Sequence, residues 1–263
     1  MRLYLELIKV HIKSAIQYKL SFFTEVLGVL LGYIGNMVIY YIMFRNFNEL
    51  NGWTFWETMF VYTYAMVCMN TSNVFFSHFC LVDSEIINGS FDKYLLRPIG
   101  NFKYYFMSKI NVSQFSTLPV SIVLFVMVSM KANIEINVFN IFIMVVSMLG
   151  SVLVNSGCLV LVGAVAFWTK KSQELYDSIL WPAQYLTFLP LTIFPAIIKV
   201  SFTYILPLAF ISYYPASIFL KRNSGAGIVS YYGYLTCLVG AVFFLITYWI
   251  WTRGIKHYEG SGS

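Results

Sequence analysis

A polar interval at residues 83–100 carries the side chains whose types and spacing are best suited to specific recognition. Within it Phe91, Tyr94 and Leu95 recur at helical spacing, which predicts a short helix with one apolar face. Pro98 ends that helix, because proline lacks the N–H that helix continuation requires. Charged side chains surround the apolar face, namely Glu85, Asp92 and Arg97. The pattern predicts that this helix docks into another protein, with its aromatic and aliphatic side chains as anchors and its charged side chains around them. The alternative is that its aromatic face attaches to lipid.

The sequence contains no recognisable catalytic motif. The histidines stand apart at positions 11, 78 and 257, and neither H-E-x-x-H, G-x-S-x-G nor a paired intramembrane carboxylate occurs. The four cysteines lie in apolar runs without the spacing of metal ligands, so no metal site is expected. A G-x-x-x-x-G-K-[ST] phosphate loop is also absent. We therefore expect no cofactor on this chain, and an intramembrane enzyme is only a minor alternative.

The composition is that of an integral membrane protein. Hydrophobic residues make up 59% of the chain, charged residues only 11%, and the mean hydropathy is +0.72. The net charge of +6 is spread along the chain without a dense basic block, which argues against a nucleic-acid partner. Membrane lipids are the expected surroundings.

Long segments with almost no charge predict an all-α protein with six transmembrane helices, because about 20 apolar residues cross a bilayer. The predicted spans are residues 22–44, 57–82, 110–130, 137–169, 176–198 and 228–252. Residues 1–21 interleave basic and apolar side chains at helical spacing and predict an amphipathic surface helix. A single membrane domain covers residues 1–258, and residues 259–263 are typical of an engineered linker.

Residues 200–220 are also uncharged and long enough to cross a membrane. A seventh span would require the chain to reverse at Lys199 without a turn-forming residue, and Pro207 and Pro215 interrupt a continuous helix. The sequence therefore favours a re-entrant or outer helical hairpin before the last span. A seven-span topology stays open.

The distribution of lysine and arginine predicts the orientation. With the N terminus inside, twelve of the 17 basic residues fall on inner segments and five on outer ones, so both termini and residues 83–100 are expected in the cytoplasm. The seven-span alternative gives the same count, so this rule does not decide between the two topologies.

Two polar stripes run along the second and fourth predicted spans. They consist of Asn70, Asn73 and Ser77, and of Ser147, Ser151 and Asn155. Such groups are costly against lipid, so we expect them to face other helices, a second subunit or a cargo pathway. Packing between helices is the favoured interpretation, because serine and asparagine commonly join helices in membranes.

Residues 89–98, G-S-F-D-K-Y-L-L-R-P, resemble the coupling loop of ATP-binding-cassette type-2 permeases. They are most similar to a bacterial branch in which the loop reads G-x-h-D-x-h-L-L-R-P, where h is apolar or aromatic. The resemblance extends over nearly the whole chain, through the entry helix, the six spans and the broken apolar segment. In that segment, residues 210–215, F-I-S-Y-Y-P, are similar to the family's outer hairpin.

This resemblance implies a permease subunit of an exporter in the bacterial plasma membrane. The loop would dock in a groove of a separate cytosolic ATPase, present in two copies with ATP and Mg²⁺, whose movement shifts the spans as rigid bodies. A second permease copy or a sister permease would complete the transporter. The residues implied in coupling are Glu85, Ile86, Gly89, Phe91, Asp92, Tyr94, Leu95, Arg97 and Pro98.

The spans have no ionisable group at their centres, which favours a hydrophobic or amphipathic cargo such as a lipid, a drug or a peptide. The alternative from another class is a channel or an accessory structural subunit. That alternative predicts that loss of Phe91 or Arg97 leaves function intact.

Overall fold

The computed structural model describes residues 19–47, 49–96, 100–109, 111, 114–220 and 228–258. Within these ranges every regular element is helical, and the only β pairing is an isolated bridge between Leu50 and Trp53. The predicted surface helix falls almost entirely outside the described residues, as do Arg97, Pro98 and the expected linker.

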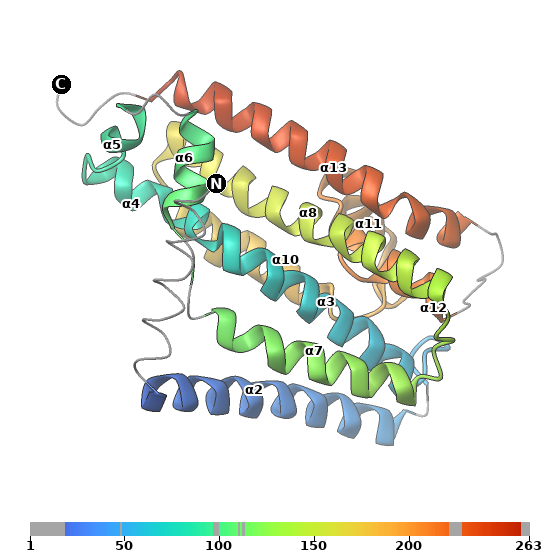
Figure 1. Cartoon of the computed structure of the whole chain (residues 1–263). Coiled ribbons are helices and arrows are strands. Elements are labelled where there is room, and N and C mark those ends of the chain that lie inside the picture. Colours follow the sequence, from blue (N-terminus) through green and yellow to red (C-terminus); the bar gives the residue numbers. More distant parts are fainter. Residues whose placement is uncertain are drawn as a thin grey trace.

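Five long helices lie side by side and form the body of the protein (Figure 1). They are α2 (Lys19–Asn46), α3 (Phe55–Phe76), α7 (Gln114–Lys131), α8 (Val138–Thr169) and α13 (Ile228–Ile255). Helix α3 continues through the 3₁₀ turn η1 (Ser77–Leu81) into α4 (Val82–Ile87).

Four helical runs are long and apolar enough to cross a membrane, or five if the bent pair described below counts as one span. The four are Val26–Asn46, Phe55–Ile87, Val138–Thr169 and Tyr231–Ile255. The apolar part of α7, Thr117–Lys131, has fewer than 18 residues and reaches less than the roughly 30 Å thickness of a bilayer core. The all-α membrane class is confirmed, whereas the count of six spans is not.

The predicted span 176–198 is not one helix. Elements α9 (Ser172–Leu175), η2 (Tyr176–Leu180) and α10 (Trp181–Leu186) follow one another directly. The chain then leaves the helix, forms the turn η3 (Leu191–Ile193) and restarts as α11 (Ala196–Val200). Pro190 and Pro195 precede the two restarts, because proline fits the start of a helix but not its interior.

The segment before the last helix is broken, as the sequence predicts. Elements α11 and η4 (Ser201–Ile205) form one arm, and η5 (Leu208–Phe210) and α12 (Tyr213–Phe219) form the other. The two arms, Ala196–Ile205 and Leu208–Phe219, bend by 80° at Leu206 and Pro207. This geometry agrees with a helical hairpin that packs against α13 and α3.

The closest helix contact joins α8 to α13. A Cβ atom added at Gly240 would lie 2.3 Å from the carbonyl oxygen of Gly150, and one at Gly150 would lie 2.5 Å from Cα of Cys237. Only glycine allows the two backbones to approach this closely. By contrast, the same construction at Gly28 and Gly32 meets nothing within 4 Å among the described residues.

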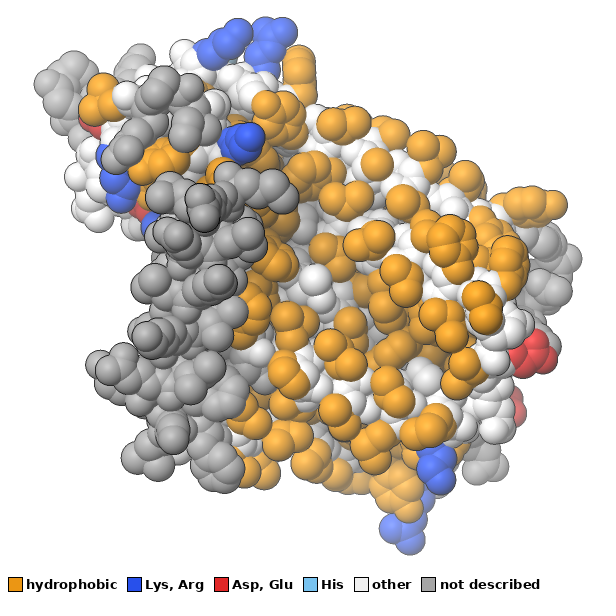
Figure 2. Space-filling view, viewed as in Figure 1, with side chains coloured by type: hydrophobic (Ala, Val, Ile, Leu, Met, Phe, Trp, Pro, Cys, Tyr) orange, Lys and Arg blue, Asp and Glu red, His pale blue; other side chains and the backbone are white. Residues whose placement is uncertain are grey.

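The face of this body seen in Figure 2 is mostly hydrophobic, with Lys and Arg side chains gathered toward its two ends. One end holds α4, α5 (Asp92–Leu95), α6 (Asn101–Ser108) and the C-terminal ends of α8 and α13 (Figure 1). Residues 83–96 and the end of the last helix thus lie on the same side, as the basic-residue count predicts.

Candidate coupling site

Gly89 shapes the turn between α4 and α5. Its φ is 67°, a left-handed conformation that glycine adopts at little cost. The Gly89 N–H donates to the carbonyl oxygen of Ile86 at 3.2 Å, and the Phe91 N–H donates to that of Glu85 at 3.1 Å. These two bonds satisfy carbonyls at the end of α4 in the manner of a glycine cap. The glycine of the loop pattern therefore sets the angle at which α5 follows α4.

The aromatic face of α5 points into the protein. Phe91 and Tyr94 are 0% and 2% exposed, although the sequence predicts them as anchors for a partner. The Phe91 ring lies 5.2 Å from that of Phe167 on α8 and 5.3 Å from that of Tyr258 after α13, and Tyr94 lies 4.9 Å from Tyr105 on α6. Rings from three elements of the same chain therefore cover both side chains, and neither is exposed to a partner in this structure.

Other side chains of the segment face outward. Leu96 is 84% exposed and Ile87 is 60% exposed, while Asp92 and Lys93 are also exposed and Leu95 is half-buried. Helical spacing does not single out Ile87 and Leu96, because it shows which residues share a face but not which face the remaining chain covers.

Two acidic residues fasten α4 to its neighbours. Glu85 is buried and pairs with Lys109 after α6, so it does not form part of an exposed charged rim as predicted. Asp83 accepts the backbone N–H of Gln173 at 3.0 Å, and its own N–H donates to the hydroxyl of Ser172 at 3.1 Å. Because buried carboxylates need such partners, these contacts hold α4 to α9 and to the chain after α6.

The chain after α13 reaches back to α5. The Tyr258 hydroxyl donates to Oδ1 of Asp92 at 2.7 Å. Burial, together with this hydrogen bond and the Asp92 charge, raises the pKa of Tyr258 to about 12, so the phenol keeps its proton at neutral pH. Burial likewise raises the pKa of Tyr105, whose hydroxyl donates to the carbonyl oxygen of His78 at 3.1 Å.

The polar stripe on α8 serves helix packing. Asn155 is fully buried, donates from Nδ2 to the Ser72 hydroxyl at 2.8 Å and accepts at Oδ1 from Gln184 at 2.6 Å. The Ser151 hydroxyl donates to the carbonyl oxygen of Phe210 at 2.9 Å, and Ser147 bonds the Tyr64 hydroxyl at 2.9 Å. These bonds join α8 to α3, α10 and the hairpin, which confirms the packing interpretation for this stripe.

The stripe on α3 is more open. Asn70 donates to the Tyr33 hydroxyl on α2 at 2.9 Å, and with Asn73 it lines a cavity of about 160 Å³ between α2, α3 and α10. Asn36 and Gln184 also line this cavity, which we call the seam cavity. Ser77 lies elsewhere, where its hydroxyl accepts from Asn111 at 3.1 Å.

The long apolar helices of this chain define a multi-pass helical membrane protein. A family model described as "ABC-2 family transporter protein" matches residues 30–262. Since that match spans most of the sequence, the chain belongs to the ABC-2 transporter family and is a membrane permease subunit of an ABC transporter. Searches of curated proteins and of solved structures gave no match. Membership of this family implies association with an ABC ATPase.

Proposed function

We propose that this permease subunit belongs to an ATP-driven exporter that moves a hydrophobic or amphipathic cargo out of the cell. Residues 83–100 receive the movement of a separate cytosolic ATPase. The observation that carries this proposal is the aromatic cluster formed by Phe91, Tyr94, Tyr105, Phe167 and Trp251. Because this cluster joins α4 and α5 to the ends of α8 and α13, displacement of the segment moves two long helices with it.

The surface that meets the ATPase is the outer side of the same segment. Ile87 and Leu96 supply exposed apolar anchors, and Asp92 and Lys93 supply charges beside them. This arrangement suits an apolar contact surrounded by a polar rim. Two ATPase copies, which hold ATP and Mg²⁺, would each engage one permease.

A second permease copy or a sister permease completes the pathway. The seam cavity carries Asn36, Asn70 and Asn73 on the side where α2 lies, and lipid tails offer such amides no hydrogen bonds. The neighbouring positions Gly28 and Gly32 leave room for another helix to approach. The polarity of the seam cavity and the open side of α2 support the approach of a second copy at this side of the chain.

Co-purification with the ATPase encoded beside this chain tests the proposal. We expect stoichiometric ATPase with the wild type and its loss from an Ile87→Glu, Leu96→Glu double variant. Ile136→Glu is the matched control, because Ile136 is similarly exposed but lies between α7 and α8, far in the chain from α4 and α5. Absence of the ATPase from the wild type would overturn the coupling proposal and favour a channel or an accessory subunit.

A further inference from the structure

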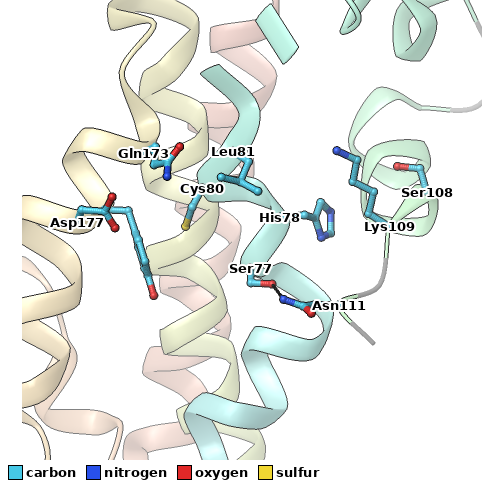
Figure 3. A pocket seen from close by; sticks show the side chains of 10 residues that line it. Ser77, His78, Cys80, Leu81, Ser108, Lys109, Asn111, Gln173 and Asp177 are labelled. Carbon is cyan, nitrogen blue, oxygen red and sulfur yellow. Dashed lines mark hydrogen bonds between the residues drawn. The ribbon is translucent and has the colours of Figure 1, made fainter. Parts of the chain in front are cut away.

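A cleft of about 430 Å³ lies next to the candidate coupling site, between η1, the end of α6 and the α9–η2 turn (Figure 3). We call it the boundary cleft. This volume falls within the range of small-molecule sites. One wall of the cleft comes from residues 77–81, close to the C-terminal end of the apolar run Phe55–Ile87. Since the end of a spanning helix passes from apolar to polar surroundings, we place the cleft near the membrane boundary.

Opposite charges stand on the two sides of the boundary cleft. Lys109 extends from the end of α6 on one side of η1, and Asp177 lies on η2 on the other side of η1 (Figure 3). The Lys109 side chain is partly exposed while it pairs with the buried Glu85. Asp177 is exposed, and no side chain in the described part of the protein bonds its carboxylate. The lining of the cleft therefore contains one cationic and one anionic side chain.

The wall between these charges has hydrogen-bonding capacity that the protein does not use. His78 is only 6% exposed, and neither of its ring nitrogens has a hydrogen-bond partner among the described residues. Buried polar groups are normally paired, so an unpaired imidazole in the wall of a cleft points to a polar ligand. The centre of the His78 ring lies 5.1 Å from that of the Tyr105 ring, with the two planes tilted by 47°.

The boundary cleft also has an apolar part. Leu81 lines it and is exposed, and Tyr176 lines it from η2. On η2 and the adjoining helix, Leu175 and Ile179 line a separate, almost wholly apolar cleft of about 140 Å³. Charged groups of both signs beside apolar surface match an amphiphile better than a soluble ion.

We propose that the boundary cleft binds the head group of a zwitterionic phospholipid that carries a primary ammonium. Lys109 contacts the phosphate, Asp177 accepts from the ammonium, and His78 bonds the head group between them. An anionic head group is disfavoured, because Glu85 already balances the Lys109 charge and Asp177 adds a negative one. This lipid site goes beyond the proposed export function and does not depend on it.

Native mass spectrometry of the full chain in detergent tests the site. The probe is an equimolar mixture of phosphatidylethanolamine, phosphatidylcholine and phosphatidylglycerol with identical acyl chains. We expect retention of phosphatidylethanolamine over phosphatidylglycerol by about fivefold or more, and a loss of about tenfold in Asp177→Asn, since a charge-assisted hydrogen bond disappears. Glu174→Gln is the matched control, because Glu174 is exposed on the neighbouring turn, pairs with Lys171 and does not line the cleft.

Two further variants keep the test decisive. Asp177→Lys should reverse the preference toward phosphatidylglycerol. A Glu85→Gln, Lys109→Gln double variant should weaken retention of the phosphate-bearing lipids without leaving a buried charge unpaired. Unchanged phosphatidylethanolamine retention in Asp177→Asn, or a wild-type preference for phosphatidylglycerol, would overturn the proposal. Displacement of the lipid by an equal concentration of soluble glycerophosphoethanolamine would overturn the assignment to a membrane lipid.

Discussion

Replacement of Phe91 by alanine should loosen the coupling segment from the ends of α8 and α13. The Phe91 ring is fully buried, and its nearest ring neighbours are Phe167 at 5.2 Å and Tyr258 at 5.3 Å. Truncation of a buried phenylalanine to alanine costs about 3–5 kcal/mol, which includes the cavity left behind. If residues 83–96 open locally, that cost raises the opening equilibrium by roughly two to three and a half orders of magnitude.

Hydrogen exchange of the backbone amides of residues 83–96 in nanodiscs measures this change directly. Phe91→Leu is the matched variant, since it keeps most of the volume and should cost less than about 1.5 kcal/mol, or roughly tenfold in exchange. Stimulation of the partner ATPase should fall with the same rank order. Loss of the ATPase contact in Phe91→Ala with unchanged amide exchange would refute this reasoning, because it would mean that the ring contacts the partner directly.

Two further predictions concern contacts that the structure places at the ends and centre of the bundle. Because the folded-state pKa of Tyr258 is raised from 10.0 to about 12, the hydrogen bond to Asp92 is fully present below pH 10 and is lost as the pH rises through 12. Amide exchange near Asp92 should therefore accelerate in that window after correction for the intrinsic rate, whereas Tyr258→Phe should show no such step. Gly240→Ala should lower the free energy of unfolding of the purified chain by about 3 kcal/mol or more, because the new methyl group would lie 2.3 Å from the Gly150 carbonyl oxygen. A thermal unfolding curve of the purified chain measures this loss. Gly28→Ala, which meets nothing within 4 Å, should not lower that free energy, and equal losses in both variants would contradict the close packing of α8 on α13.

The differences from the predicted topology have local causes. The span 176–198 is predicted from its uncharged length, and that length does not show that Pro190 and Pro195 divide the segment. Likewise α7 is apolar enough to cross a membrane but has a shorter apolar run than a bilayer core requires. Uncharged length by itself therefore does not show where a helix is broken or short.

The sequence by itself determined the class of this protein, the course of its longest helices, the break near Pro207 and the turn at Gly89. Each of these depends on local properties, namely apolar length, the missing N–H of proline and the positive φ open to glycine. The family resemblance of residues 89–98 followed from the same local pattern, and the match over residues 30–262 confirmed the family.

Only the tertiary structure decided what these residues touch. Helical spacing predicts that Phe91 and Tyr94 share a face. In the structure, rings of α6, α8 and the chain after α13 bury that face, and Leu96 is exposed. The boundary cleft likewise joins Lys109 and Asp177, which no local pattern connects. Spacing along one helix defines which side chains share a face. Whether that face is buried depends on which segments, distant in the sequence, pack against it.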